Sequence, residues 1–207
     1  MMAFRSDHRR FALWAAAVLV VILPPWWLWG ADLAAALLRP LVGLLLKATG
    51  VHGVIATADG WNVLTGLSLA NGKGEFVLGV KQDTLRRFLL GFPLLLAFMA
   101  APPRTDRPWS AVAAGALALT AVFLFSVITY VWGELAPLLN PSLSPAGQAP
   151  VVALAAEPLH PAIAQIVLLG RYSGMSVLPL LTAVLVWAAT NPSGMRALGG
   201  APVEDPH

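Results

Sequence analysis

Arg171 is the ionisable residue of this chain whose position most strongly suggests chemistry. It stands between two apolar segments, 161–170 and 172–191. A charge at membrane depth is costly and often functional, so this guanidinium could bind a carboxylate or a phosphate at the mouth of a helical bundle. Glu134 and Glu157 are its candidate ion-pair partners. The alternative is that Arg171 only extends to the membrane surface, as long cationic side chains do.

Arg86 and Arg87 present the same choice at the start of the apolar segment 85–101. They could hold lipid phosphates or a carboxylate, or they could only mark the end of a helix. Together with Arg171 and Glu134 they make up the candidate anion or partner-binding site, which would face the outer leaflet.

Other kinds of chemistry lack their usual residues. The chain has no cysteine, which excludes a thiolate nucleophile, a disulfide and a cysteine-ligated metal. Its four histidines do not follow a metal-binding spacing, and no serine-hydrolase, zinc-protease or phosphate-loop motif is present. The four histidines are His8, His52, His160 and His207. We therefore predict no catalytic residue, no metal site and no cofactor, and a protein that is not an enzyme.

The composition defines the class of protein. Of the 207 residues, 58% are hydrophobic and only 11% are charged, whereas about a quarter of a soluble domain is charged. This excludes a soluble enzyme, a disordered chain and a nucleic-acid-binding domain. A single multi-pass membrane domain remains.

Four segments are long and apolar enough to be transmembrane helices. Trp26, Trp27 and Trp29 form an aromatic belt at the end of the first, where Pro24 and Pro25 should kink or end the helix. The predicted spans are residues 11–29, 85–101, 109–132 and 172–191. We expect an all-α membrane fold with one small extracytoplasmic sheet.

The distribution of basic residues predicts the orientation. Four spans place both termini on one side, and arginines flank that side, including the tail 192–207. The opposite loop, residues 133–170, is rich in proline and contains no lysine or arginine. The positive-inside rule then places both termini on the cytoplasmic side of the membrane. Against this, the first outer segment, residues 31–83, also contains several lysines and arginines.

The first outer segment divides into a helix and a sheet. Over residues 31–48 a polar seam recurs at helical spacing, which predicts a helix lying along the membrane surface. A fifth span is excluded because only seven residues separate Arg39 from Lys47. Farther on, residues alternate with period two between turn signals, which predicts an antiparallel meander of three strands. The predicted strands are 51–57, 61–69 and 75–81.

The order of these parts resembles the bacterial exosortase H-associated membrane proteins. The likeness rests on the Trp-rich first span, the surface helix with the stranded segment, and two stretches, 89–104 and 170–187. The first stretch contains Pro93-Leu94-Leu95-Leu96 and Ala101-Pro102-Pro103-Arg104, and the second contains Gly170-Arg171-Tyr172 and Leu178-Pro179. The resemblance implies an accessory of a protein-sorting system. Exosortases process the C-terminal membrane tails of exported proteins with a cysteine and arginines, and this chain has no cysteine.

Two classes of function follow. In the first, the chain is a non-enzymatic accessory subunit that packs against a larger exosortase-like membrane partner, against exported-protein tails and among membrane lipids, and its outer meander docks a polypeptide, for instance by strand addition. In the second, it is a small membrane enzyme or a lipid-binding or anion-binding protein, in which the outer arginines and Glu134 form one site. Transport is disfavoured because no inverted halves and no buried acid are evident.

Overall fold

The structure is a computed structural model that describes residues 2–69, 72–102, 107–140, 159–175, 177–192 and 194–195. The first half of the chain contains, in order, α1 (Met2–Pro25), η1 (Trp26–Gly30), α2 (Ala31–Ala48), β1 (Gly53–Thr57), β2 (Gly60–Ser68) and β3 (Glu75–Lys81). The second half contains α3 (Gln82–Phe88), α4 (Gly91–Ala100), α5 (Pro108–Leu139), α6 (Pro161–Gly174) and α7 (Val177–Thr190).

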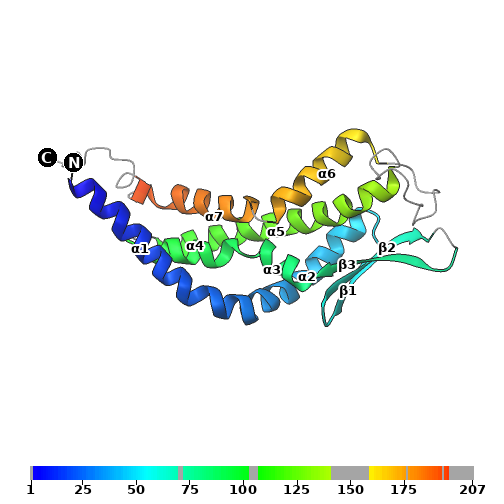
Figure 1. Cartoon of the computed structure of the whole chain (residues 1–207), viewed down its shortest axis with the longest axis horizontal. Helices are drawn as coiled ribbons and strands as arrows, with labels where there is room; N and C mark the ends of the chain where they lie inside the picture. Colours follow the sequence, from blue (N-terminus) through cyan, green and yellow to red (C-terminus); the bar gives the residue numbers. More distant parts are fainter. Residues whose placement is uncertain are drawn as a thin grey trace.

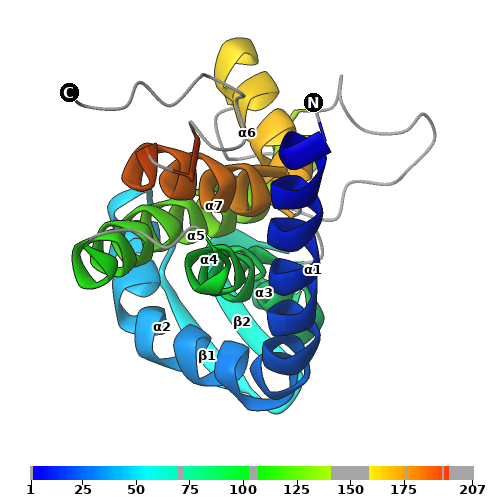
Figure 2. The same cartoon turned by 90° about the vertical axis from the view of Figure 1, so that its left-hand side faces the viewer.

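The helices form an elongated bundle with the sheet at one end (Figure 1). The start of α1 and the end of α7 lie at the other end, and α5 runs along most of the length. Viewed end-on, α4 occupies the middle and packs against α1, α5 and α7 (Figure 2). The helix ends opposite the sheet are joined by the rings of Phe11, Phe98 and Trp187, whose centroids are 5.0–5.9 Å apart.

The first helix continues beyond the point where the sequence predicts its end. α1 passes through the π-helical turn η1 into α2, so His8–Ala48 is one candidate span of 41 residues. Pro24 and Pro25 lack the N–H groups of a regular helix, and the π turn that follows absorbs this irregularity. The glycine of this turn accommodates an aromatic ring, because a Cβ on Gly30 would lie 2.7 Å from Trp26 Cε3. The helix therefore does not end at residue 29, where the predicted first span ends.

The predicted span 85–101 is two short helices. α3 has 7 residues and α4 has 10, and Leu89 and Leu90 form a turn between them. Pro93 is the reason for the break, because proline without an N–H is tolerated in the first turn of a new helix and not in a helix interior. A helix of 10 residues is about 15 Å long, half the thickness of a hydrocarbon core. Neither helix is a complete span.

α5 is longer than predicted and shortens the outer loop. The predicted span 109–132 is a helix from Pro108 to Leu139, with Pro137 in its last turn. The proline-rich loop therefore does not begin at residue 133. Most of the remaining loop, including Glu157, lies outside the described residues.

The predicted span 172–191 begins inside one helix and ends at the close of another. α6 covers Pro161–Gly174 and α7 covers Val177–Thr190, and the two axes are bent by 70°. Pro179 in the first turn of α7 explains why a new helix begins there. Within the described residues, two helices are long and apolar enough to cross a membrane, or three if the bent pair is one span. The predicted set of four spans is not confirmed.

The antiparallel meander is confirmed. The strand order is β1-β2-β3, and Val54 pairs with Val63, which pairs with Leu78. Trp61, Val63 and Thr65 alternate into the interior, as period two requires. Trp61 lies 6.2 Å from the ring of Phe123 on α5, so the buried face of the sheet rests on the helices.

Candidate functional site

Arg86 on α3 is bound by a carboxylate that sequence analysis did not connect with it. Its Nε and Nη2 atoms donate to the two oxygens of Asp32 on α2, both at 2.8 Å. Gln82 Nε2 donates to the same carboxylate at 2.7 Å. Hydrogen bonding to Asp32 raises the pKa of Arg86 above its usual value, so this guanidinium stays charged. The pair fastens α3 to the start of α2.

Arg87, the neighbouring residue of α3, has a different environment. Its side chain is exposed, whereas only 21% of the Arg86 side chain is accessible. Consecutive residues of a helix point about 100° apart, so one turns toward α2 and the other away from it. The two arginines predicted to act together therefore point in different directions.

Arg171 and Glu134 form the ion pair that the sequence suggested. Arg171 Nη2 on α6 lies 2.7 Å from Glu134 Oε1 on α5, and about a quarter of each side chain is accessible. The guanidinium also lies 5.4 Å from the ring of Tyr172. Its Nε atom is buried and has no hydrogen-bond acceptor within the described parts of the chain.

Tyr130 on α5 connects the neighbourhoods of the two ion pairs. Its hydroxyl faces both Glu134 and Thr84, and Thr84 lies on α3 two residues before Arg86. Polar side chains thus continue from α6 through α5 and α3 to α2. Of the predicted site residues, the structure brings Arg171 and Glu134 together, places Arg86 with Asp32, and leaves Arg87 at the surface.

Close packing of α6 on α5 brings Arg171 to Glu134. A Cβ on Gly133 would lie 2.8 Å from Arg171 Cβ, and one on Gly170 would lie 2.7 Å from Thr129 Cγ2. Gly174 meets Ser126 in the same way. Sequence analysis missed this contact, although Gly170 and Gly174 have the four-residue spacing typical of closely packed membrane helices.

A groove between α2 and β1 was also missed. Arg39 and Lys47 line it from α2, and His52 lines it from the residue before β1. Its other described lining residues are apolar or glycine, and its volume is about 490 Å³. Gly43 faces open space in this groove, because a Cβ there would meet nothing within 4 Å. The predicted polar seam of this helix was the available signal, but the sequence does not show that a strand edge lies beside it.

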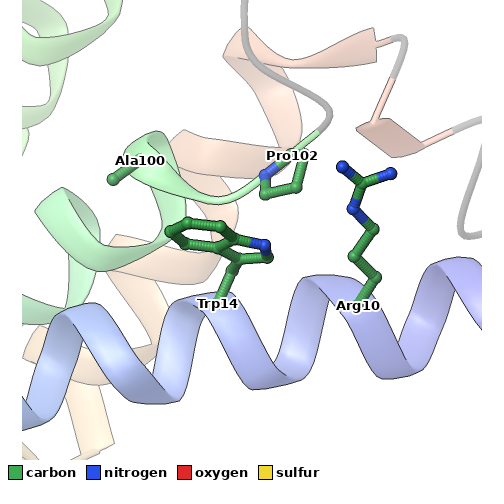
Figure 3. Close-up of a pocket in the computed structure, with 4 residues that line it drawn as sticks. All are labelled: Arg10, Trp14, Ala100 and Pro102. Atoms are coloured by element: carbon green, nitrogen blue, oxygen red, sulfur yellow. The ribbon is translucent and has the colours of Figure 1, made fainter.

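A second hollow lies at the opposite end of the bundle. Arg10 and Trp14 of α1 line it together with Ala100 and Pro102 at the end of α4, and its volume is about 410 Å³ (Figure 3). The indole lies beneath Pro102, and the guanidinium reaches up beside it. Within the described residues, no cluster of three or more metal-ligating side chains occurs here or elsewhere.

Comparison with known proteins gives one finding on the family. A family model described as exosortase H-associated membrane protein matches residues 5–194. No curated protein and no solved structure matches the chain.

Proposed function

The chain belongs to the exosortase H-associated membrane proteins, and on that premise we propose that it is a non-enzymatic accessory of an exosortase-type sorting system. In this role it packs against the sorting enzyme, and it also contacts the C-terminal tails that the enzyme processes. The rest of its surface meets membrane lipids.

An exposed stripe of leucines on α2 is the observation that carries this proposal. Leu33, Leu37, Leu41 and Leu44 follow spacings of four, four and three, and between 40% and 72% of each residue is accessible. The helix of 41 residues to which they belong is about 62 Å long, roughly twice the hydrocarbon thickness. Lipid tails therefore do not cover the whole helix.

The position of the sheet indicates which part of this helix lies outside the hydrocarbon core. In the part of the chain that the structure describes, no further strand pairs with the outer edge of β1 or β3, and an open edge does not occur against lipid tails. The sheet must lie outside the hydrocarbon, and it draws the end of α2 with it because α2 packs on β1. An apolar stripe in that position is typical of an interface with another protein.

The charged side chains support an accessory role over an anion-binding one. Asp32 and Glu134 each neutralise one of the arginines proposed for an anion site, at 2.8 Å and 2.7 Å. Those guanidinium groups are already used within the chain, where they join α3 to α2 and α6 to α5. The proposed orientation places the start of α1 and the end of α7 on the cytoplasmic side of the inner membrane. It places the sheet on the opposite side.

The test is recovery of the partner from membranes. The affinity-tagged chain is co-expressed with the exosortase of the same host, extracted in a mild detergent and purified. We expect the enzyme to co-purify with the wild-type chain, and Leu37→Trp to lower its recovery about fivefold, because a large ring does not fit a packed interface.

Leu117→Trp is the matched control, because Leu117 on α5 is 75% exposed and the proposal places it against lipid. Both variants should reach wild-type abundance, and only Leu37→Trp should lose the partner. Purification of the wild-type chain without the enzyme would overturn the proposal, and equal loss in both variants would remove α2 as the interface.

One observation favours the second candidate, a small membrane enzyme or a lipid or anion site at the outer leaflet. The buried Nε of Arg171 lacks an acceptor among the described residues.

In a strain deleted for the chain, we expect precursors with C-terminal membrane tails to remain unprocessed. Arg171→Ala should restore processing if the chain is a packing accessory, and fail to restore it, at wild-type abundance, if the arginine acts on a ligand.

A further inference from the structure

We propose that the groove between α2 and β1 binds an extended, carboxylate-rich polypeptide segment as an additional strand beside β1. The inference deepens the proposed function, on which it rests for its biological setting, since it assigns the place where a tail segment docks. Its chemistry can be measured on the isolated protein.

The backbone of β1 provides the first half of the argument. β1 is an outer strand, so β2 occupies one of its two sides, and within the described residues no strand occupies the other. The groove follows β1, because residues 53–55 line it and Leu64 is its only described lining residue from β2. Free N–H and C=O groups on an edge strand accept an extended peptide in register. The five residues of β1 cover about 17 Å.

The charges provide the second half. Arg39, Lys47 and His52 line the groove, and no carboxylate belongs to its described lining. Within the described residues neither Arg39 nor Lys47 makes an ion pair, while the nearby Glu75 lies 3.4 Å from His52 and accepts a hydrogen bond from Gly66 N–H. Basic side chains on one wall and an open strand edge on the other favour an acidic peptide.

The arrangement of α2 brings these two walls together. Arg39, Gly43 and Lys47 are four residues apart and so share one face of the helix. Lys47 extends along the start of β1, because its Cε lies 3.8 Å from the position of a Cβ on Gly53. A side chain at either glycine would narrow the groove where a peptide backbone must approach.

The test measures peptide binding to the full-length chain in uncharged detergent micelles by fluorescence anisotropy. The probe is a fluorescein-labelled decapeptide in which glutamate alternates with threonine. We expect it to bind, and we expect the counterpart with lysine in place of glutamate to bind at least about tenfold more weakly. Lys47→Glu should weaken binding of the glutamate peptide about tenfold.

Lys81→Glu is the matched control, because it makes the same change of charge at the end of β3, the other outer strand. It should change the affinity less than about twofold. Equal loss in both variants would show that net charge alone governs binding and would overturn the assignment. Circular dichroism and a thermal melt verify that Lys47→Glu is folded.

Backbone methylation of the peptide tests strand addition without altering the protein. Alternate residues of an added strand direct their N–H groups to β1, so N-methylation at one set of alternate positions should abolish binding and the other set should leave it unchanged. Equal binding of both sets would indicate a site for any anion, such as a lipid phosphate, and would overturn strand addition.

Failure of this inference is distinguishable from failure of the proposed function. If Lys47→Glu loses the peptide but retains the exosortase on purification, the groove and the α2 stripe have separate roles, as proposed. If the wild-type chain retains the exosortase but binds neither peptide, the groove assignment is wrong and the accessory role stands. If it binds the glutamate peptide but not the enzyme, the accessory role is wrong and the groove stands.

Discussion

The contact between α5 and α6 permits a quantitative prediction for Gly170→Ala. The new Cβ would lie 2.7 Å from Thr129 Cβ and Cγ2 and 2.8 Å from its Oγ1, about 0.7 Å short of the 3.4 Å at which ordinary contact begins. Thr129 does not rotate away freely, because it is β-branched and its hydroxyl donates to the Phe125 carbonyl at 2.9 Å. The helices must therefore separate.

Overpacking of this kind costs about 1–3 kcal/mol, and the stiffness of Thr129 favours the upper half of that range. Replacing glycine by alanine within a helix returns about 1 kcal/mol through helix propensity. We expect Gly170→Ala to lower the free energy of unfolding by about 1–2 kcal/mol, which is a factor of about 5–30 in the unfolding equilibrium.

The assay is unfolding by a denaturing detergent in mixed micelles, followed by fluorescence of the eight tryptophans. Gly43→Ala is the control, because a Cβ there meets nothing within 4 Å. It should leave stability unchanged or raise it by up to about 1 kcal/mol. If Gly170→Ala is as stable as Gly43→Ala, α5 and α6 do not pack at the distance described and the reasoning is refuted.

Two further predictions concern the Asp32–Arg86 ion pair between α2 and α3 and the orientation in the membrane. Asp32→Ala removes three hydrogen bonds of 2.7–2.8 Å and should destabilise the chain by about 1–3 kcal/mol in the same assay. The control Asp83→Ala, with 70% of the side chain exposed and a contact of 3.4 Å, should cost less than about 0.5 kcal/mol. Equal effects would show that Asp32 does not hold α3 against α2. Because the chain has no cysteine, the thiol of Ala58→Cys between β1 and β2 would be its only one, and a membrane-impermeant maleimide should label it in intact spheroplasts. Labelling only after lysis would reverse the proposed orientation.

The helix breaks inside the predicted spans could not be predicted from sequence patterns. Hydropathy measures how apolar a segment is, and the segments around Leu89, Leu90 and Pro93 are apolar throughout. Whether proline begins a new helix there or kinks a continuous one depends on neighbours, and here α4 restarts against α7, where a Cβ on Gly91 would lie 2.5 Å from the Pro179 carbonyl oxygen. Pro24 and Pro25 had the opposite outcome, since a π turn carries the helix onward.

The candidate site was partly predictable. Arg171 was matched with Glu134 and Glu157 because the predicted spans put all three in the same outer layer, and the structure shows the pair with Glu134. Asp32 was not matched with Arg86, because the two are 54 positions apart and the sheet lies between them in sequence. Only the return of α3 alongside α2 brings them together.

The sequence by itself determined the membrane class and the three strands with their inward alternation. These properties follow from composition and from periodicities of a few residues, which require no knowledge of distant contacts. The resemblance to the family rests instead on the order of the parts and on the stretches 89–104 and 170–187. Only the tertiary structure decided which arginine meets which carboxylate, where the helices break, and that a basic helix face lies along an open strand edge. Such features depend on the packing of segments far apart in the chain. A glycine such as Gly170 or Gly43 matters there because it has no side chain to occupy the space beside it.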